Sequence, residues 1–375
     1  MKQKLLALVC TLALVVSLAG CVISTPDTVG SLGDYEISSG LYLLAQYDAY
    51  QKAADLASSD QDAANVKAFL KQTITVDSDS GETATVSDYV ARKTLENLQT
   101  YAATELRFDE LGGQLTAEEE QQADSYAQQL MDNYGDAYTA NGIGLETLKL
   151  FQQLQYKQVL LLDLVYGKDG ETPVEDGELT EHLDSTMYEI GFITVPLYNT
   201  STFAFASDDQ KAEMLSLAQK AADSYNAAAP EDTSSQLTAF NSIASSALTG
   251  ICAVLDAEVP STSTLQTDLL SESDLTDAFT QEGAADTLRG LAYGQAAAIQ
   301  YSGYALMLAV RLDPLGVSTL DALRSQILSD LKGEELDDAL AAYGAQLDNS
   351  LSSSAMSKLP AAKIVNATSS TSANS

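Results

Sequence analysis

The feature that most constrains the fold is a change in hydrophobic period near residue 187. Before it, through 38–186, apolar residues recur three or four positions apart, which is the spacing of amphipathic helices. At 188–195 the sequence YEIGFITV reads as a β-strand, and two more strands joined by a turn are expected at 294–311. Helical spacing returns at 318–345. The sequence therefore predicts an α+β fold that is mostly helical, with one strand-bearing segment late in the chain.

The same order of patterns predicts how the chain is divided. A chain of 375 residues is long enough for two or three domains. We expect a signal peptide at 1–20, a polar lipidated tether at 21–33, a helical domain at 34–186, an inserted α+β domain at 187–313, a helix that returns to the helical domain at 314–350 and a disordered tail at 351–375. The tail is assigned from its Ser, Thr and Ala content, because such a segment has little apolar surface to bury.

The first 21 residues resemble the signal peptide of a bacterial lipoprotein. Lys2 and Lys4 precede an apolar run at 5–18 that is too short for a comfortable membrane span. The run leads into a lipobox-like sequence, Leu18-Ala19-Gly20-Cys21. The resemblance implies cleavage before Cys21, lipid on its thiol, and an extracytoplasmic protein that the lipid anchors to the cell membrane. The alternative is a plain secretory signal in which Cys21 is incidental.

The balance of charge argues against one class of partner. The chain has 19 Lys and Arg against 53 Asp and Glu, a formal net charge of −34. Binding to nucleic acid requires clustered basic side chains, so we expect no nucleic-acid partner. Anionic lipid would also repel such a surface, and attachment to a membrane would therefore depend on the lipid chains, at about 0.8 kcal/mol for each buried methylene.

The histidine and cysteine content narrows the possible chemistry. Of three cysteines, Cys10 leaves with the signal peptide and Cys21 carries lipid, so Cys252 has no disulfide partner and is expected to be a small buried residue. The one histidine, His182, is expected on an exposed helix face. One histidine excludes most zinc sites and most Ser–His or Cys–His catalysis unless His182 is itself the base. We therefore expect no metal and no cofactor.

Four stretches carry a resemblance to a known family. They are Gly144–Leu148 with the helix to Tyr166, Val174–Leu179, Ala285–Gln295 and Gln300–Leu308. Together they resemble the extracytoplasmic foldases of the PrsA and SurA type, over nearly all of 34–350. The resemblance implies a helical chaperone domain of the trigger-factor and SurA kind, built from both chain ends around an inserted parvulin-type prolyl isomerase domain.

Both histidines of the parvulin pattern are replaced in this chain. The first parvulin strand typically carries a Ser-His pair, and the matching residues are Gly191-Phe192. The closing strand carries Gly-Tyr-His, and the matching residues are Gly303-Tyr304-Ala305. The family's Cys or Asp position is open between Cys252 and Asp256. Whether the chain is an enzyme stays open, and we expect isomerase activity to be weak or lost. The resemblance still implies an apolar proline pocket, formed by Phe192, Tyr304, Ala305 and Met307.

The expected function is that of a membrane-anchored chaperone or foldase whose partners are unfolded or newly secreted polypeptides. Aromatic side chains offer large contact areas with a polar handle. The candidates for client binding are Tyr35, Tyr42, Tyr47 and Tyr50, although core positions are the default for each. One alternative is an active prolyl isomerase. A second is a non-catalytic scaffold or solute-binding lipoprotein, against which the lack of alternating strands and helices counts. No oligomeric state is predicted.

Overall fold

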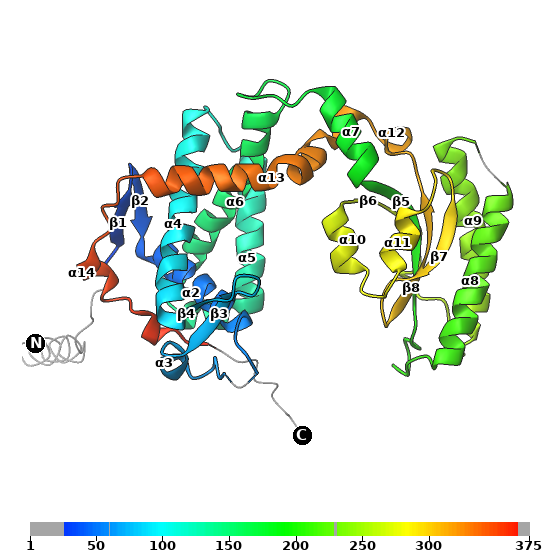
Figure 1. The fold of residues 1–375 in the computed structure, drawn as a ribbon, viewed down its shortest axis with the longest axis horizontal. Coiled ribbons are helices and arrows are strands. Elements are labelled where there is room, and N and C mark those ends of the chain that lie inside the picture. Colours follow the sequence, from blue (N-terminus) through cyan, green and yellow to red (C-terminus); the bar gives the residue numbers. More distant parts are fainter. Residues whose placement is uncertain (1–25, 60, 229–230, 367–375) are drawn as a thin grey trace, which may run out of the picture. The chain divides into compact units, whose positions relative to one another are not determined.

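The computed structural model describes residues 26–59, 61–228 and 231–366, which form two compact units (Figure 1). Unit 1 takes the chain up to Leu164 and again from Glu334, and unit 2 is Val165–Gly333. Unit 2 is thus inserted into the sequence of unit 1, which is formed by the two ends of the chain. This confirms the expected fold class, a mostly helical α+β protein in which a helical unit from both chain ends surrounds an α+β insertion in sequence. Within the described ranges, no helix has the length and apolar character needed to cross a membrane.

Unit 1 consists mainly of long helices. Its elements are β1 (Thr28–Leu32), β2 (Tyr35–Ser38), α2 (Ser39–Asp55), α3 (Val66–Phe69), β3 (Thr73–Asp77), β4 (Glu82–Thr85), α4 (Val86–Glu110), α5 (Ala117–Ala140), most of α6 (Leu145–Tyr166), the second half of α13 (Leu320–Gln346), α14 (Ser353–Met356) and the short helix η1 (Ala361–Lys363). Thr116 and Glu119 form a capping box that fixes the start of α5. α2 packs along α4, with Leu41 and Leu98 fully buried in one cluster.

The prediction of a polar tether at 21–33 is wrong for residues 26–33, the part of it that the structure describes. Residues Thr28–Leu32 form β1, which pairs antiparallel with β2, and Val29 and Leu32 are fully buried. These two buried side chains hold β1 against unit 1. The backbone N–H and C=O groups of β1 form hydrogen bonds with β2. A second antiparallel hairpin, β3–β4, precedes α4. The turn of this hairpin contains Gly81 at φ 70, a conformation that favours glycine.

The expected disordered tail at 351–375 is also wrong where the chain is described. Residues 347–366, here called the C-terminal strap, run over unit 1. The backbone N–H groups of Ser350 and Ser352 donate to carbonyl groups of β1 at 3.0 and 2.7 Å. Leu359 is 8% exposed within the same unit. The polar composition of the strap concealed these anchoring contacts.

Unit 2 is a four-stranded antiparallel sheet with helices on both faces. Its elements are the end of α6, α7 (Asp176–Thr186), β5 (Tyr188–Pro196), α8 (Asp208–Ala228), α9 (Thr233–Ala253), β6 (Gln266–Leu270), α10 (Glu272–Ala278), α11 (Ala284–Arg289), β7 (Ala296–Gln300), β8 (Ala305–Arg311), α12 (Pro314–Val317) and the first half of α13. The strand order is β6-β5-β8-β7. α10 and α11 are separated by a turn containing Gly283 at φ 74.

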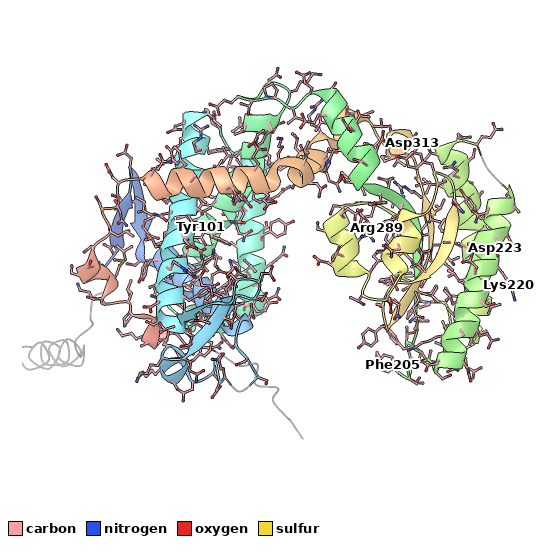
Figure 2. All side chains as sticks on the ribbon, in the orientation of Figure 1. Tyr101, Phe205, Lys220, Asp223, Arg289 and Asp313 are labelled. Carbon is pink, nitrogen blue, oxygen red and sulfur yellow. The ribbon has the colours of Figure 1, made fainter. Side chains whose placement is uncertain are left out.

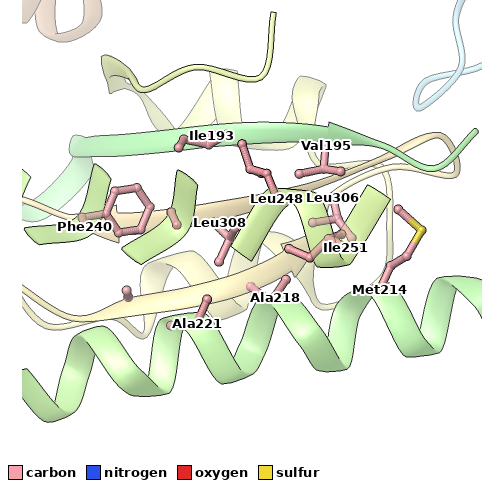
Figure 3. Close-up of a cluster of buried hydrophobic side chains, with 14 of the residues drawn as sticks. Ile193, Val195, Met214, Ala218, Ala221, Phe240, Leu248, Ile251, Leu306 and Leu308 are labelled. Carbon is pink, nitrogen blue, oxygen red and sulfur yellow. The ribbon is translucent and has the colours of Figure 1, made fainter. Parts of the chain in front are cut away.

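The alternation of side chains along β5 and β8 gives the sheet two apolar faces. On one face Ile193, Leu306 and Leu308 pack under α8 and α9, in the cluster shown in Figure 3. On the other face Ile190 and Met307 pack against α10 and α11. Both faces are therefore covered, and what remains for function in unit 2 lies at the sheet's ends and loops.

Candidate functional site

The four residues of the predicted proline pocket do not lie together. Phe192 lies opposite Ala309 of β8, and Pro196 lies opposite Ala305. Alternation therefore places Phe192, Ala305 and Met307 on the face toward α10 and α11, where Met307 is only 5% exposed. Tyr304 does not join them: it is 63% exposed, and its ring contacts Phe205 with 5.7 Å between ring centroids. The prediction of one four-residue pocket is wrong with respect to Tyr304.

The polar groups on this face bind one another. Glu272 of α10 accepts hydrogen bonds from the Tyr188 hydroxyl at 2.5 Å and from Arg289 at 2.8 Å. The hydrogen bond from Arg289, then that from Tyr188, holds the pKa of Glu272 below its ordinary value. Arg311 lies over the Tyr188 ring at 4.6 Å. Phe192, Ala305 and Met307 have no titratable group, and the acidic and basic side chains beside them are paired with one another around Glu272.

Two of the four tyrosines predicted to bind clients belong to the core of unit 1. Tyr42 and Tyr50 are 8% and 0% exposed. The Tyr50 hydroxyl donates to the carbonyl of Ala63 at 2.6 Å, and burial raises the pKa of Tyr50 to about 12. Tyr35 is half-buried, and its hydroxyl oxygen is enclosed. For Tyr42 and Tyr50 the surface role is wrong, because the apolar stripe of α2 faces the core.

The remaining tyrosine, Tyr47, lines a groove of about 430 Å³ on the helices of unit 1. We call it the aromatic groove. Its lining residues come from α2, α4, α5 and α6: Leu44, Tyr47, Asp48, Gln51, Lys52, Asn97, Thr100, Tyr101, Tyr138, Phe151 and Gln155. Tyr101 is labelled in Figure 2. The sequence indicated only Tyr47 of this set.

Two aromatic pairs form the apolar part of the groove. Tyr47 meets Tyr138 edge to face at 6.3 Å, and Tyr101 meets Phe151 in the same way at 5.7 Å. All four rings are half-buried, so each is held in place and still partly accessible. Burial, followed by the nearby charge of Asp48, raises the pKa of Tyr101, and its hydroxyl stays protonated at neutral pH. The groove therefore offers fixed ring edges and faces with neutral hydroxyl groups.

A polar network borders these rings. Asp48 of α2 accepts a hydrogen bond from the Asn97 side chain at 2.9 Å and pairs with Lys52 at 3.2 Å. Gln51, Gln155 and Thr100 add neutral donors and acceptors. A polypeptide backbone offers one donor and one acceptor per residue, so such a border suits it without regard to sequence.

The other residues that the sequence analysis singled out do not line the aromatic groove. Cys252 is buried and free, and burial raises the pKa of its thiol. His182 is not a solvated surface residue as expected, because its Nε2 lies 2.6 Å from Asp330 Oδ2. Among the described residues, no cluster of three or more His, Cys, Asp or Glu is placed to hold a metal ion. The lipobox residues, Leu18, Ala19, Gly20 and Cys21, lie outside the described residues.

Comparison of the structure with solved structures returns PrsA foldases. The foldase protein PrsA from Streptococcus pneumoniae is 12% identical, with a TM-score of 0.36 over 72% of this chain and 92% of that chain. PrsA from Bacillus subtilis is 14% identical, with a TM-score of 0.29 over 77% of this chain and 93% of that chain. No protein-family model matches the chain, and no curated protein matches it.

Proposed function

We propose that the protein is an extracytoplasmic chaperone or foldase that binds unfolded secreted polypeptides in the aromatic groove of unit 1. Lipid on Cys21 would hold it at the cell membrane. The observation that carries the proposal is the groove itself, in which two edge-to-face aromatic pairs lie beside polar side chains that include the Asp48–Lys52 ion pair. Its volume of about 430 Å³ is within the range of ligand-binding pockets in proteins.

The chemistry of the groove suits binding without strict sequence choice. Aromatic rings accept any apolar side chain, since the contact is non-directional apart from ring orientation. Tyr101 and Tyr138 add hydroxyl groups that burial keeps neutral, because burial raises the pKa of both. Each ring is already fixed by its partner, so binding costs little side-chain entropy. These properties favour many weak complexes with unfolded segments over one tight complex.

We further propose that unit 2 has little or no prolyl isomerase activity. Isomerisation requires only that a site lower the roughly 18–20 kcal/mol barrier to rotation of the amide. A polar group beside the proline is what would assist that rotation, and Phe192 and Ala305 occupy both matched histidine positions. Met307 is buried under α10 and α11, which leaves a small apolar surface only.

The groove is tested by suppression of aggregation. The chain without residues 1–21 is mixed with a reduced, aggregating secreted protein, and light scattering is followed for wild type, Tyr101→Ser/Phe151→Ser and Tyr126→Ser. Tyr126, which is 51% exposed on α5 outside the groove, is the matched control. We expect suppression by the wild type and the control, and its loss in the groove variant. Tyr101→Phe, which keeps the ring, should retain suppression and guards against misfolding of the double variant.

Isomerase activity is tested on Xaa-Pro tetrapeptides with an active parvulin as positive control. Several residues are placed before proline, because the acidic chain would repel acidic peptides. Rates at the uncatalysed level support a scaffold role for unit 2. A clear acceleration that Phe192→Ala abolishes would overturn that part of the proposal and leave the groove unaffected.

A further inference from the structure

One end of unit 2 carries a cluster of exposed aromatic side chains. Phe203, Phe205 and Tyr304 are 73%, 65% and 63% exposed. Phe205 contacts Tyr198 at 5.9 Å and Tyr304 at 5.7 Å between ring centroids, so these rings form one continuous surface. Figure 2 labels Phe205 at this end of the unit. We call Tyr198, Phe203, Phe205 and Tyr304 the aromatic tip.

The backbone at the aromatic tip is strained. Phe203 has φ 57 and Asp256, in a neighbouring loop, has φ 49. These are the two non-glycine residues with positive φ in the described part of the chain. A left-handed conformation is uncommon for a bulky aromatic residue, and Phe203 gains no burial in return. Strain of this kind persists where the surrounding structure imposes it, and it concentrates at functional sites.

Asn199 imposes this conformation. Its side-chain carbonyl accepts hydrogen bonds from the backbone N–H groups of Ser201 and Thr202 at 2.9 and 3.0 Å. Its amide donates to the carbonyl of Leu255 at 3.0 Å, which ties the loop to the end of α9. Phe203 closes the turn with a 2.7 Å bond from its N–H to the Asn199 carbonyl. These hydrogen bonds fix the loop in a conformation that exposes the rings of Phe203 and Phe205 to solvent.

The residues beside the aromatic tip are acidic. Asp208 and Asp209 follow Phe205 closely in the chain, and Asp256 and Glu258 belong to the loop that Asn199 contacts; all four are exposed. The neighbouring cation is Lys211, which pairs with Asp208 at 3.9 Å. The tip thus combines apolar rings with an excess of negative charge.

We propose that the aromatic tip is a second polypeptide-binding surface, selective for extended segments in which basic residues alternate with apolar ones. Apolar side chains contact the rings, and lysine or arginine side chains meet the surrounding carboxylates or the ring faces. An anionic membrane would be repelled by the same carboxylates. The inference rests on the proposed function only in taking a polypeptide as the partner, because the site lies on unit 2 and shares no residue with the aromatic groove.

The test measures binding of a fluorescein-labelled peptide of alternating arginine and leucine by anisotropy, with its glutamate–leucine counterpart as the second probe. The chain without residues 1–21 is compared with Phe203→Ser/Phe205→Ser, Asp208→Asn/Asp209→Asn and the groove variant. Matched controls are Tyr126→Ser for the rings and Asp223→Asn/Glu231→Gln for the charges; Asp223 lies about 20 Å along α8 from Asp208 and is labelled in Figure 2.

We expect the ring variant to bind the arginine peptide about tenfold more weakly or worse, as for loss of interface aromatic residues. The charge variant should bind it several-fold more weakly at low salt and lose that difference at high salt. Equal binding by the tip variants and their controls, or equal binding of both peptides, would overturn the inference. Association with phosphatidylcholine or phosphatidylglycerol vesicles in place of peptide would overturn it too. Aggregation suppression that depends on the groove alone would leave the proposed function standing.

Discussion

At the scale of single residues, Glu189 is a carboxyl group placed where charge is disfavoured. It lies opposite Leu269 between two strands and is 5% exposed. Burial raises the pKa of Glu189 to about 7, and the charge of Asp268 contributes in the same direction. The folded chain therefore holds a proton there, from about pH 4.5 to about pH 7, that the unfolded chain has released. The free energy of unfolding falls as pH rises through this window.

Glu189→Gln is expected to remove that penalty. The variant should raise the free energy of unfolding of unit 2 by about 1–3 kcal/mol at about pH 8 and change it little below about pH 5. Urea unfolding followed by circular dichroism at both pH values measures the difference. Asp268→Asn, which removes the smaller cause at an exposed position, should act in the same direction with less effect. A gain of equal size at both pH values would contradict the titration argument.

At the scale of elements, α13 contains a matched pair of glycines. A Cβ atom on Gly344 would lie 2.5 Å from the backbone carbonyl oxygen of Gln99 in α4, whereas one on Gly333 would meet nothing within 4 Å. Gly344→Ala should force the two helices apart and destabilise unit 1 by about 1–3 kcal/mol. Gly333→Ala should stabilise the helix by about 0.5–1 kcal/mol. Thermal unfolding of both variants is the measurement, and shifts of the same sign would refute the close approach of α13 to α4.

One of the side chains that hold the C-terminal strap is Asn141, which binds the backbone of Val365. The Asn141 amide donates to the Val365 carbonyl at 2.9 Å, and its oxygen accepts from the Val365 N–H at 2.8 Å. Asn141→Ala should cost about 1 kcal/mol, because it removes two part-buried hydrogen bonds to the strap backbone. Trypsin cleavage after Lys358 should become faster, whereas Asn133→Ala, at an exposed position of the same helix, should leave it unchanged. Unaltered cleavage in Asn141→Ala would show that the strap is held elsewhere.

The long helices and the central strands were predictable because their signal is local. A helix expected at 318–345 is α13 at Leu320–Gln346, and a strand expected at 188–195 is β5 at Tyr188–Pro196. The hairpins of unit 1 were missed because their strands have only four or five residues, too few for a clear pattern. The strap was missed because its anchoring side chains, such as Ala355, Leu359 and Ile364, are scattered through a stretch rich in Ser and Ala.

The candidate site was less predictable than the fold. Tyr47 was chosen from a tyrosine-rich helix, but its partners in the aromatic groove come from three other helices: Tyr138 from α5, Tyr101 from α4 and Phe151 from α6. A spacing rule within one helix contains no information about such long-range neighbours. Tyr304 was misplaced because it belongs to the turn between β7 and β8, where strand alternation no longer fixes the face on which a side chain lies.

At the scale of the whole molecule, each unit has the contents of an independent domain. The two clusters that cover the faces of the sheet in unit 2 draw all their residues from 188–312. However, α7 and the first half of α13 lie outside 188–312 and contact each other through polar side chains. His182 meets Asp330, and Arg324 pairs with Asp176. The stable unit therefore extends beyond the sheet-bearing segment 187–313.

This difference can be measured by excising both segments. Residues 165–333 should fold alone and unfold in one cooperative transition, because they keep both sheet faces covered and retain α7 with its partner helix. Residues 187–313 lack α7, whose Leu179 and Leu183 are fully buried, at about 1.5–3 kcal/mol for each such side chain. We expect this shorter segment to be less stable in urea by several kcal/mol or to remain unfolded. Equal stability of the two segments would mean that α7 and α13 are attachments to a complete domain, and the boundaries expected from the sequence would then be the correct ones.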